Sequence, residues 1–129
     1  HQRIQEAIGR FEPASGAIEK VFISANPQSA LVLGQARGSA LLALAQSGLE
    51  VNEYSALEIK RAITGTGRAG KDQVQHMVRV LLSIDRKPPQ DAADALACAI
   101  CHLHYAKVRQ RQADAGAGVS AGDAGGLQR

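Results

Sequence analysis

This chain of 129 residues has little of several residue types, and each shortage excludes something. It has no Trp, two Phe and two Tyr, so its core must be small and built from aliphatic side chains. No stretch approaches the roughly 18 apolar residues of a membrane span, and no signal-peptide pattern is present. These absences predict a cytoplasmic protein, in which the two Cys stay reduced. The first residue is His1, within a helical pattern, which indicates a fragment or a processed chain.

The charge is distributed unevenly along the chain. Residues 1–59 carry four basic and six acidic side chains, for a net charge of −2, whereas residues 60–111 carry ten basic and four acidic ones, for +6. A basic half with a few acids inside it is typical of a polyanion-binding surface that also holds a cation. The alternative for any single Lys or Arg is that it only solvates a helix face.

Periodicity, breakers and capping signals predict the order of elements along the chain. Asn26 and Pro27 are a helix cap and first position, and Ser55 with Glu58 fits a capping box. The predicted helices cover 1–11, 27–47, about nine residues from 56, 71–83 and 91–112, and the predicted strands cover 17–23 and 49–54. Residues 113–129 are Gly, Ala, Ser and Asp with almost nothing to bury, which predicts a disordered tail after a domain of residues 1–112.

The two strands flank a helix that contains small residues, which is the pattern of a βαβ unit with parallel strands. We therefore expect an α/β fold with two parallel strands and about five helices. Two strands are too few for an independently stable sheet. The sequence predicts that further strands lie upstream of His1 or come from another chain.

Two motifs have the spacing of known binding sites, but neither has the other features that its site requires. Gly65 to Lys71 has the spacing of a phosphate-binding loop, but Asp72 replaces the required Ser or Thr and would repel a nucleotide. Cys98, Cys101 and His102 have the spacing of a haem attachment site, yet they fall in the middle of an apolar helix. We expect both Cys to pack as small hydrophobic side chains rather than to bind haem or zinc.

Three acids form the strongest candidate site. Asp91 and Asp94 follow Pro88-Pro89 and lie three residues apart at the start of a helix, so both can face one cation. The alternative is that Asp91 caps the helix and Asp94 sits in its positive first turn. Glu19 lies within an apolar strand, where a carboxylate is costly unless it is paired, metal-bound or directed to solvent at a sheet edge. Together the three make an oxygen-ligand set suited to Mg²⁺ or Mn²⁺.

Five motifs in a fixed order resemble the RuvC family of Holliday-junction resolvases, over about residues 1–107. They are Ala17-Ile-Glu19-Lys-Val-Phe22, Ser29-Ala-Leu-Val-Leu-Gly-Gln-Ala-Arg-Gly38, Ile63-Thr-Gly-Thr-Gly67, Lys71-Asp-Gln-Val-Gln-His-Met-Val78 and Asp91-Ala-Ala-Asp-Ala-Leu96. The resemblance implies a ribonuclease H-like fold, a homodimer and cleavage of four-way DNA junctions by a pair of magnesium ions.

The resemblance also implies roles for individual residues. Glu19 matches the second of four catalytic acids, and Asp91 and Asp94 match the last two, all as metal ligands. The first acid, in a Gly-Ile-Asp-Pro-Gly motif, is absent, so the chain resembles a member without its N-terminal third.

Further residues of the motifs match positions that the family uses on DNA. Lys60 and Lys71 match basic positions that contact DNA, and Lys71 is also expected to stabilise charge on the phosphate. Phe22 matches an aromatic residue that meets bases, with an ordinary core Phe as the alternative. Independently of the resemblance, the basic glycine-rich loop predicts that Arg68 contacts the nucleic-acid backbone. We interpret Gln35 and Arg37 as scaffold or dimer surface.

The sequence therefore predicts a metal-dependent endonuclease of DNA recombination and repair, inactive or nearly so as this fragment. The expected partners are a four-way junction, a second copy of the chain and a branch-migration motor complex. The alternative from another class is a non-catalytic DNA-binding or dimerisation module derived from a resolvase.

Overall fold

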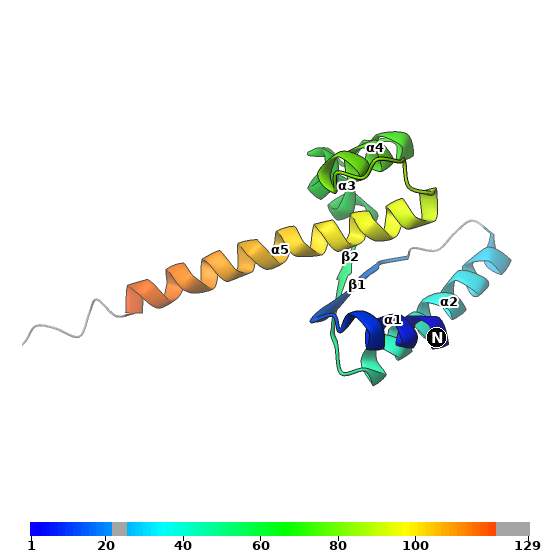
Figure 1. Cartoon of the computed structure of the whole chain (residues 1–129), viewed down its shortest axis with the longest axis horizontal. Coiled ribbons are helices and arrows are strands. Elements are labelled where there is room, and N and C mark those ends of the chain that lie inside the picture. The colour runs from blue at the N-terminus through cyan, green and yellow to red at the C-terminus, as the bar shows by residue number, and fades with distance from the viewer. Residues whose placement is uncertain (22–25, 121–129) are drawn as a thin grey trace, which may run out of the picture.

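The computed structural model describes residues 1–21 and 26–120, and five helices and two strands lie within them (Figure 1). In chain order these are α1 (Gln2–Phe11), β1 (Ser15–Glu19), α2 (Pro27–Gln46), β2 (Glu50–Tyr54), α3 (Ala56–Thr64), α4 (Lys71–Leu81) and α5 (Gln90–Ser120). The number and order of the elements confirm the sequence prediction.

The two strands pair in parallel, with Ser15 opposite Glu50 and Glu19 opposite Tyr54. α2 crosses over between them, and the Asn26 side chain caps it by accepting from the backbone N–H groups of Gln28 at 3.0 Å and Ser29 at 3.4 Å. The predicted βαβ unit is thus confirmed. α1 and α2 lie on one side of this small sheet, and α3, α4 and α5 lie on the other (Figure 1).

β1 begins at Ser15, earlier than the predicted start at residue 17. The prediction was wrong there because Gly16 is not a breaker but a contact point. A Cβ on Gly16 would lie 3.0 Å from the Leu44 side chain, so its absence lets α2 approach the strand closely. β1 also ends at Glu19, so residues 20 and 21 of the predicted strand are not part of it, and residues 22 and 23 lie outside the described residues.

α5 continues to Ser120, beyond its predicted end at residue 112, so the part of the predicted tail up to that residue is helical. Ala is the strongest helix former, and Ala113, Ala115 and Ala117 continue the backbone hydrogen bonds without burying a face, although Gly116 and Gly118 lie among them. The side chains from 107 to 118 are all exposed. In Figure 1 this part of α5 extends well beyond the rest of the molecule. Residues 121–129 lie outside the described residues.

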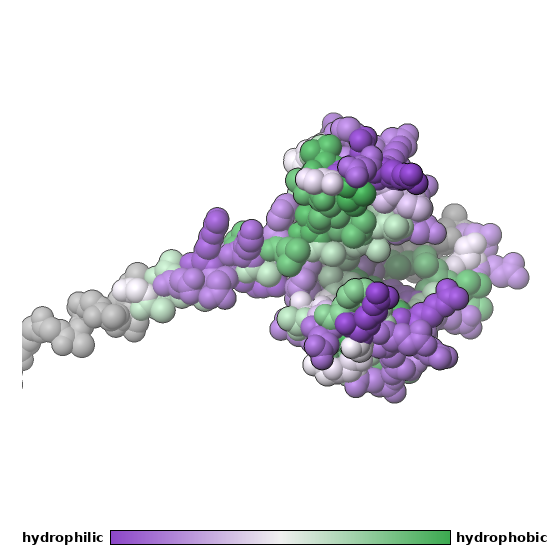
Figure 2. All heavy atoms as spheres, viewed as in Figure 1, coloured by the Kyte–Doolittle hydropathy of each residue, from purple (hydrophilic) through white to green (hydrophobic). Residues whose placement is uncertain are grey.

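α4 ends at Leu81 rather than at the predicted residue 83, because Ser83 adopts a positive φ of 52° that no helix accommodates. The core joins the sheet to α3, α4 and α5 through side chains that are nearly all aliphatic or small, with Val78 and Cys101 fully buried. Figure 2 shows apolar side chains gathered where α4 meets α5. Among them Leu81, Leu82 and Leu103 remain between 41% and 61% exposed.

Cys98 and Cys101 lie in this core as free thiols, which confirms that they pack as small hydrophobic side chains. Burial raises the pKa of both thiols to about 11, so they are un-ionised at neutral pH. Thiols in this state are poor nucleophiles and poor metal ligands. No helix in the described part of the chain is long and apolar enough to cross a bilayer.

Candidate metal and nucleic-acid site

Two acids and two lysines from four different elements meet in one pocket of about 320 Å³. Glu19 comes from the end of β1, Lys60 from α3, Lys71 from the start of α4 and Asp94 from α5. Ala56, Ile59, Val74 and Ala97 supply the apolar part of the lining. Four of the predicted site residues, far apart in sequence, are therefore neighbours in the fold.

The position of Glu19 is fixed by backbone pairing and by Arg37. Just beyond Glu19, the N–H of Lys20 donates to the carbonyl of Tyr54 at 2.8 Å and continues the parallel pairing. The Arg37 Nε donates to the Glu19 carbonyl at 3.4 Å, and its guanidinium pairs with the Glu53 carboxylate. Arg37, which we interpreted as scaffold or dimer surface, ties α2 to the ends of both strands. None of these bonds involves the Glu19 carboxylate, and Glu19 lines the pocket.

Lys60 is positioned by the capping box that starts α3 directly after β2. The Ser55 hydroxyl accepts from the Glu58 N–H at 3.2 Å, and the Glu58 carboxylate accepts from the Ser55 N–H at 2.7 Å. These bonds lower the pKa of the Glu58 carboxyl below its ordinary value of 4.5. The predicted capping box is confirmed. It fixes the start of α3 directly after β2, and Lys60 of this helix lines the same pocket as Glu19.

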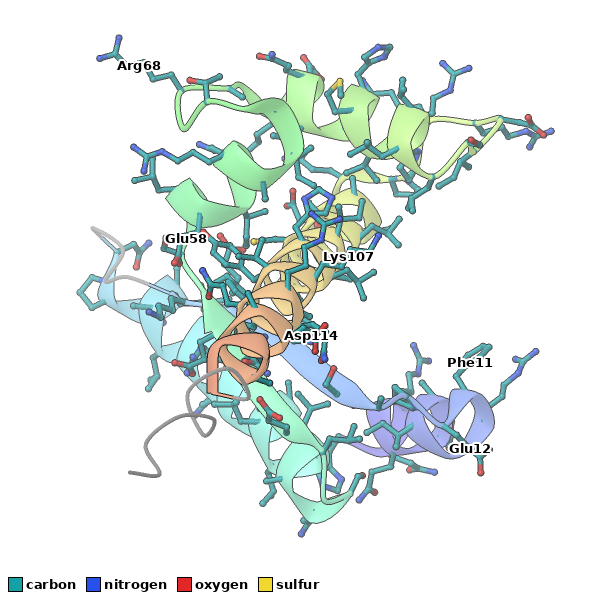
Figure 3. All side chains as sticks on the ribbon, turned by 90° about the vertical axis from the view of Figure 1, so that its left-hand side faces the viewer. Phe11, Glu12, Glu58, Arg68, Lys107 and Asp114 are labelled. Atoms are coloured by element: carbon teal, nitrogen blue, oxygen red, sulfur yellow. The ribbon has the colours of Figure 1, made fainter. Side chains whose placement is uncertain are left out.

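The glycine-rich loop between α3 and α4 presents one lysine to the pocket and directs an arginine away from it. Gly65 ends α3 with a φ of 79°, and Gly70 precedes Lys71, the first residue of α4. Arg68 points away from the body of the molecule (Figure 3). Its contact with nucleic acid stays a prediction, as does the base contact of Phe22, which lies outside the described residues.

Asp91 and Asp94 are both exposed in the first turns of α5, but only Asp94 lines the pocket. No three His, Cys, Asp or Glu side chains among residues 1–21 and 26–120 come close enough together to hold a metal ion. The structure thus brings Glu19 and Asp94 to one pocket, and leaves Asp91 outside its lining. The role of the three acids as a ligand set stays a prediction.

The turn before these acids is held by α4. The Gln75 side chain donates to the carbonyl of the buried Pro88 at 2.5 Å, and Lys87 pairs with Asp72 at 3.4 Å. Because Pro88 lies two residues before the start of α5 at Gln90, these contacts fix where α5 begins relative to Lys71. Pro88 and Pro89, the two predicted breakers, lie at the end of the loop between α4 and α5, as expected.

The carboxylates repel each other across the pocket. Glu19 is exposed at the end of β1, but partial burial of its carboxyl raises the pKa above its ordinary value of 4.5, the charge of Asp94 raises it further, and the nearby Lys60 opposes both effects. The positive charge of a divalent cation bound between the two acids would offset this repulsion. Hard cations also prefer carboxylate oxygens as ligands. Glu19 and Asp94 therefore fit a magnesium or manganese ion as two of its ligands.

The sequence reasoning missed one group of polar residues beside the pocket. His102, only 8% exposed, is hydrogen-bonded through Nε2 to the Ser15 hydroxyl at 2.8 Å and through Nδ1 to the Tyr54 hydroxyl at 2.9 Å. We had considered His102 only as part of the Cys98–Cys101 motif. Its place on the helix that carries Asp94, next to the core position of Cys101, was the signal for a buried histidine.

The fold is ribonuclease H-like, and two solved structures show it. "Thermus thermophilus RuvC structure" aligns with a TM-score of 0.75 and 37% identity over 84% of this chain and 66% of that chain. "T. thermophilus RuvC in complex with Holliday junction substrate" aligns with a TM-score of 0.79, at the same identity and coverage.

The family model described as "Crossover junction endodeoxyribonuclease RuvC" matches residues 1–102, and this chain belongs to the RuvC family. Two relatives described in the same words come from Marinobacter nauticus, 55% identical over 115 residues, and Francisella philomiragia, 54% identical over 112 residues. These matches cover 89% and 87% of this chain and 66% of each relative. The chain thus spans just under two thirds of the length of these relatives. The family and the fold class predicted from the sequence are confirmed.

Proposed function

We propose that this chain is part of a structure-selective endodeoxyribonuclease that resolves four-way DNA junctions by metal-dependent hydrolysis. The observation that carries the proposal is the pocket in which Glu19 and Asp94 face Lys60 and Lys71. Carboxylates beside lysines suit a site that binds a cation and a phosphate together. The relatives are described as crossover junction endodeoxyribonucleases, and one similar solved structure contains a Holliday junction.

In this proposal Glu19, Asp91 and Asp94 are the metal ligands, and Mg²⁺ is the metal, with Mn²⁺ able to replace it. Bound ions of this kind activate water and stabilise a leaving oxygen in phosphodiester hydrolysis. The residues of the chain hold and orient the reacting groups. Lys71, at the start of α4, is placed to stabilise negative charge on the phosphate, and the positive charge of Lys60 favours the ionised form of Glu19 that a metal ligand needs.

The DNA-binding surface consists of Lys60, Lys71 and Arg68, with Phe22 as a base contact beyond the end of β1. Phosphate contacts of this type fix the position of DNA without reading its sequence. Lys60 and Lys71 would therefore hold the scissile phosphate over the acids, while Arg68, which points away from the core, would contact a neighbouring phosphate (Figure 3).

We also propose that the active form is a homodimer assembled through α2. This helix exposes Leu31 by 63%, Val32 by 64% and Leu42 by 52%, although it carries no charged side chain other than Arg37. Large apolar side chains exposed in this way are typical of an interface. A branch-migration motor is a further proposed partner, and the cytoplasm, where bacterial DNA lies, is the proposed site of action.

A second candidate is a non-catalytic DNA-binding module. The observation in its favour is that, in the part of the chain that the structure describes, no three metal-binding side chains cluster. A module of this class would bind junctions through its lysines and would have no need of Asp91 or Asp94. Both candidate functions predict DNA binding, and only the endonuclease predicts cleavage.

Binding of a synthetic four-way junction by the 129-residue chain tests the part that both candidates share. Each phosphate neutralised by a lysine adds about 0.9 to the slope of log affinity against log salt. We expect the Lys60→Ala, Lys71→Ala double variant to lose about 0.9 of slope per lysine. The measurement is fluorescence anisotropy in EDTA over a range of salt concentrations. Arg3→Ala, which removes an exposed charge from α1, is the control and should leave the slope unchanged. If log affinity falls with log salt at the same slope for the parent and the double variant, Lys60 and Lys71 do not belong to the DNA-binding surface.

A further inference from the structure

The buried group around His102 connects three separate elements. Ser15 is the first residue of β1, Tyr54 is the last residue of β2, and His102 lies in the middle of α5. The imidazole bonds both hydroxyls, at 2.8 and 2.9 Å, and Tyr54 is itself only 5% exposed. We call Ser15, Tyr54 and His102 the buried triad, although Ser15 itself is only half-buried.

The hydrogen bonds of the buried triad are complete. A neutral imidazole has one donor and one acceptor nitrogen, and a hydroxyl can serve as either. One hydroxyl therefore donates to the ring while the other accepts from it. No buried side-chain nitrogen or oxygen is left unpaired in the part of the chain that the structure describes. The rings add to the contact, since Tyr54 lies with its centroid 5.8 Å from that of His102 and stacks on Tyr105 at 5.4 Å.

The neighbouring core side chains of α5 are mostly small and apolar. Ala97, Cys98 and Cys101 belong to the same core cluster as Tyr54, and none of them exceeds 6% exposure. Hydrophobic contacts are non-directional, so small side chains alone would allow the helix to slide or rotate on the sheet. Hydrogen bonds have fixed distances and angles, and the buried triad supplies two of them. The triad is thus the directional part of this interface.

The same elements carry the two acids of the pocket. Glu19 is the last residue of the strand that begins at Ser15, and it stands opposite Tyr54 in the sheet. Asp94 precedes His102 on α5 by about two turns, or roughly 12 Å of rigid helix. A small rotation of α5 about its axis at His102 would therefore move Asp94 away from Glu19.

We infer that His102 is a positioning residue, which fixes α5 on the two strands through the Ser15 and Tyr54 hydroxyls and so holds Asp94 opposite Glu19. The functional meaning of this geometry rests on the metal site proposed above. The positioning itself does not depend on a metal, so it can be tested without one.

Distances between spin labels test the positioning directly. Labels at Lys20→Cys, just beyond β1, and Arg109→Cys, on α5, lie on exposed positions of the two elements. The buried native thiols, with their pKa near 11, stay unlabelled. We expect Tyr54→Phe and His102→Phe to shift or broaden the distance distribution in double electron–electron resonance. His102→Gln, which keeps one donor and one acceptor, should restore much of it.

Two control variants separate positioning from a simple loss of stability. His104→Phe changes an exposed histidine on the same helix, and Ile63→Val weakens the core without touching the triad. Both should keep the parent distance distribution. A distribution unchanged in Tyr54→Phe and His102→Phe, or changed equally in Ile63→Val, would overturn the inference.

Mn²⁺ affinity, measured by the loss of the free-ion electron paramagnetic resonance signal, tests the consequence for the site. Loss of a supporting hydrogen bond around a metal ligand weakens metal binding about 10- to 100-fold. We expect Tyr54→Phe to weaken Mn²⁺ binding by about tenfold, and Ile63→Val to leave it unchanged. If the distances shift but the parent binds no Mn²⁺, these 129 residues do not form the metal site by themselves, and the positioning role stands. If the parent binds Mn²⁺ and Tyr54→Phe binds it equally well, the triad does not hold the acids in place.

Discussion

Glu19 occupies a position where a carboxylate lowers the stability of the fold. Burial and the charge of Asp94 raise its pKa above 4.5, so the folded chain binds a proton there more readily than the unfolded chain does. The free energy of unfolding therefore falls as the pH rises through the interval between 4.5 and the raised pKa. Above that interval the penalty is complete, which is typical of acids that are kept for function.

We expect Glu19→Gln to raise Tm at pH 7, because the amide removes the charge that Asp94 repels. The gain should shrink as the pH falls, and vanish well below 4.5, where Glu19 is protonated in both states. Thermal unfolding followed by circular dichroism between about pH 3 and pH 8 measures it. Asp85→Asn, which removes an exposed carboxylate elsewhere, is the matched control and should show no such dependence. A lower Tm for Glu19→Gln at pH 7 would show that Glu19 stabilises the fold instead.

The sequence singled out Glu19 because an acid in an apolar strand is unusual. It could not predict which of Asp91 and Asp94 faces Glu19. The two positions lie on one helix face, and the rotation of α5 on the sheet is set by the hydrogen bonds of His102. Those contacts involve residues from β1 and β2 that are distant in sequence, so local patterns carry no information about them.

Two helices of this chain, α2 and α3, begin where side chains satisfy their free N–H groups. Asn26 caps α2, and the reciprocal bonds of Ser55 and Glu58 start α3. Because such bonds join residues two or three positions apart, they can be predicted from the sequence, and both were. Gly16 was misread for the opposite reason. Its role depends on Leu44, which belongs to another element.

We expect Ser55→Ala to cost about 1 kcal/mol of unfolding free energy at pH 7, since it removes the cap of α3. The lowered pKa of Glu58 means that its contribution is present above 4.5 and is lost as the pH falls through the lowered value. The cost of Glu58→Gln should therefore disappear in strong acid. Urea unfolding at several pH values measures both effects. Ser47→Ala, whose hydroxyl only donates to the Ala43 carbonyl at the end of α2, is the control. An equal cost for both serine variants would argue against a special role for the capping box.

The assembled chain brings together residues that the sequence keeps apart. The charge asymmetry predicted a basic surface around acids, and the pocket of Glu19, Lys60, Lys71 and Asp94 is where the two meet. The family resemblance predicted the fold correctly, because its motifs follow the elements in order. The buried triad has no such motif. It arises only when β1, β2 and α5 pack together, and sequence patterns within one element cannot reveal it.

The central claim is that Glu19 and Asp94 belong to a metal-dependent centre that cuts DNA junctions. Since no three acids cluster in the described residues, we expect little or no cleavage by the 129-residue chain itself. The active form to test is this chain completed with the part of the Marinobacter nauticus relative that it does not match. Asp94→Asn is the informative variant, and Asp72→Asn, which removes an exposed acid at the start of α4, is its control.

The most direct measurement is the rate at which these proteins cut a synthetic four-way junction with and without Mg²⁺. We expect the completed protein and Asp72→Asn to cut it only when Mg²⁺ is present. Asp94→Asn should bind the junction with unchanged affinity and leave it intact. Cleavage by Asp94→Asn at the rate of the completed protein, or cleavage that persists in EDTA, would contradict the claim.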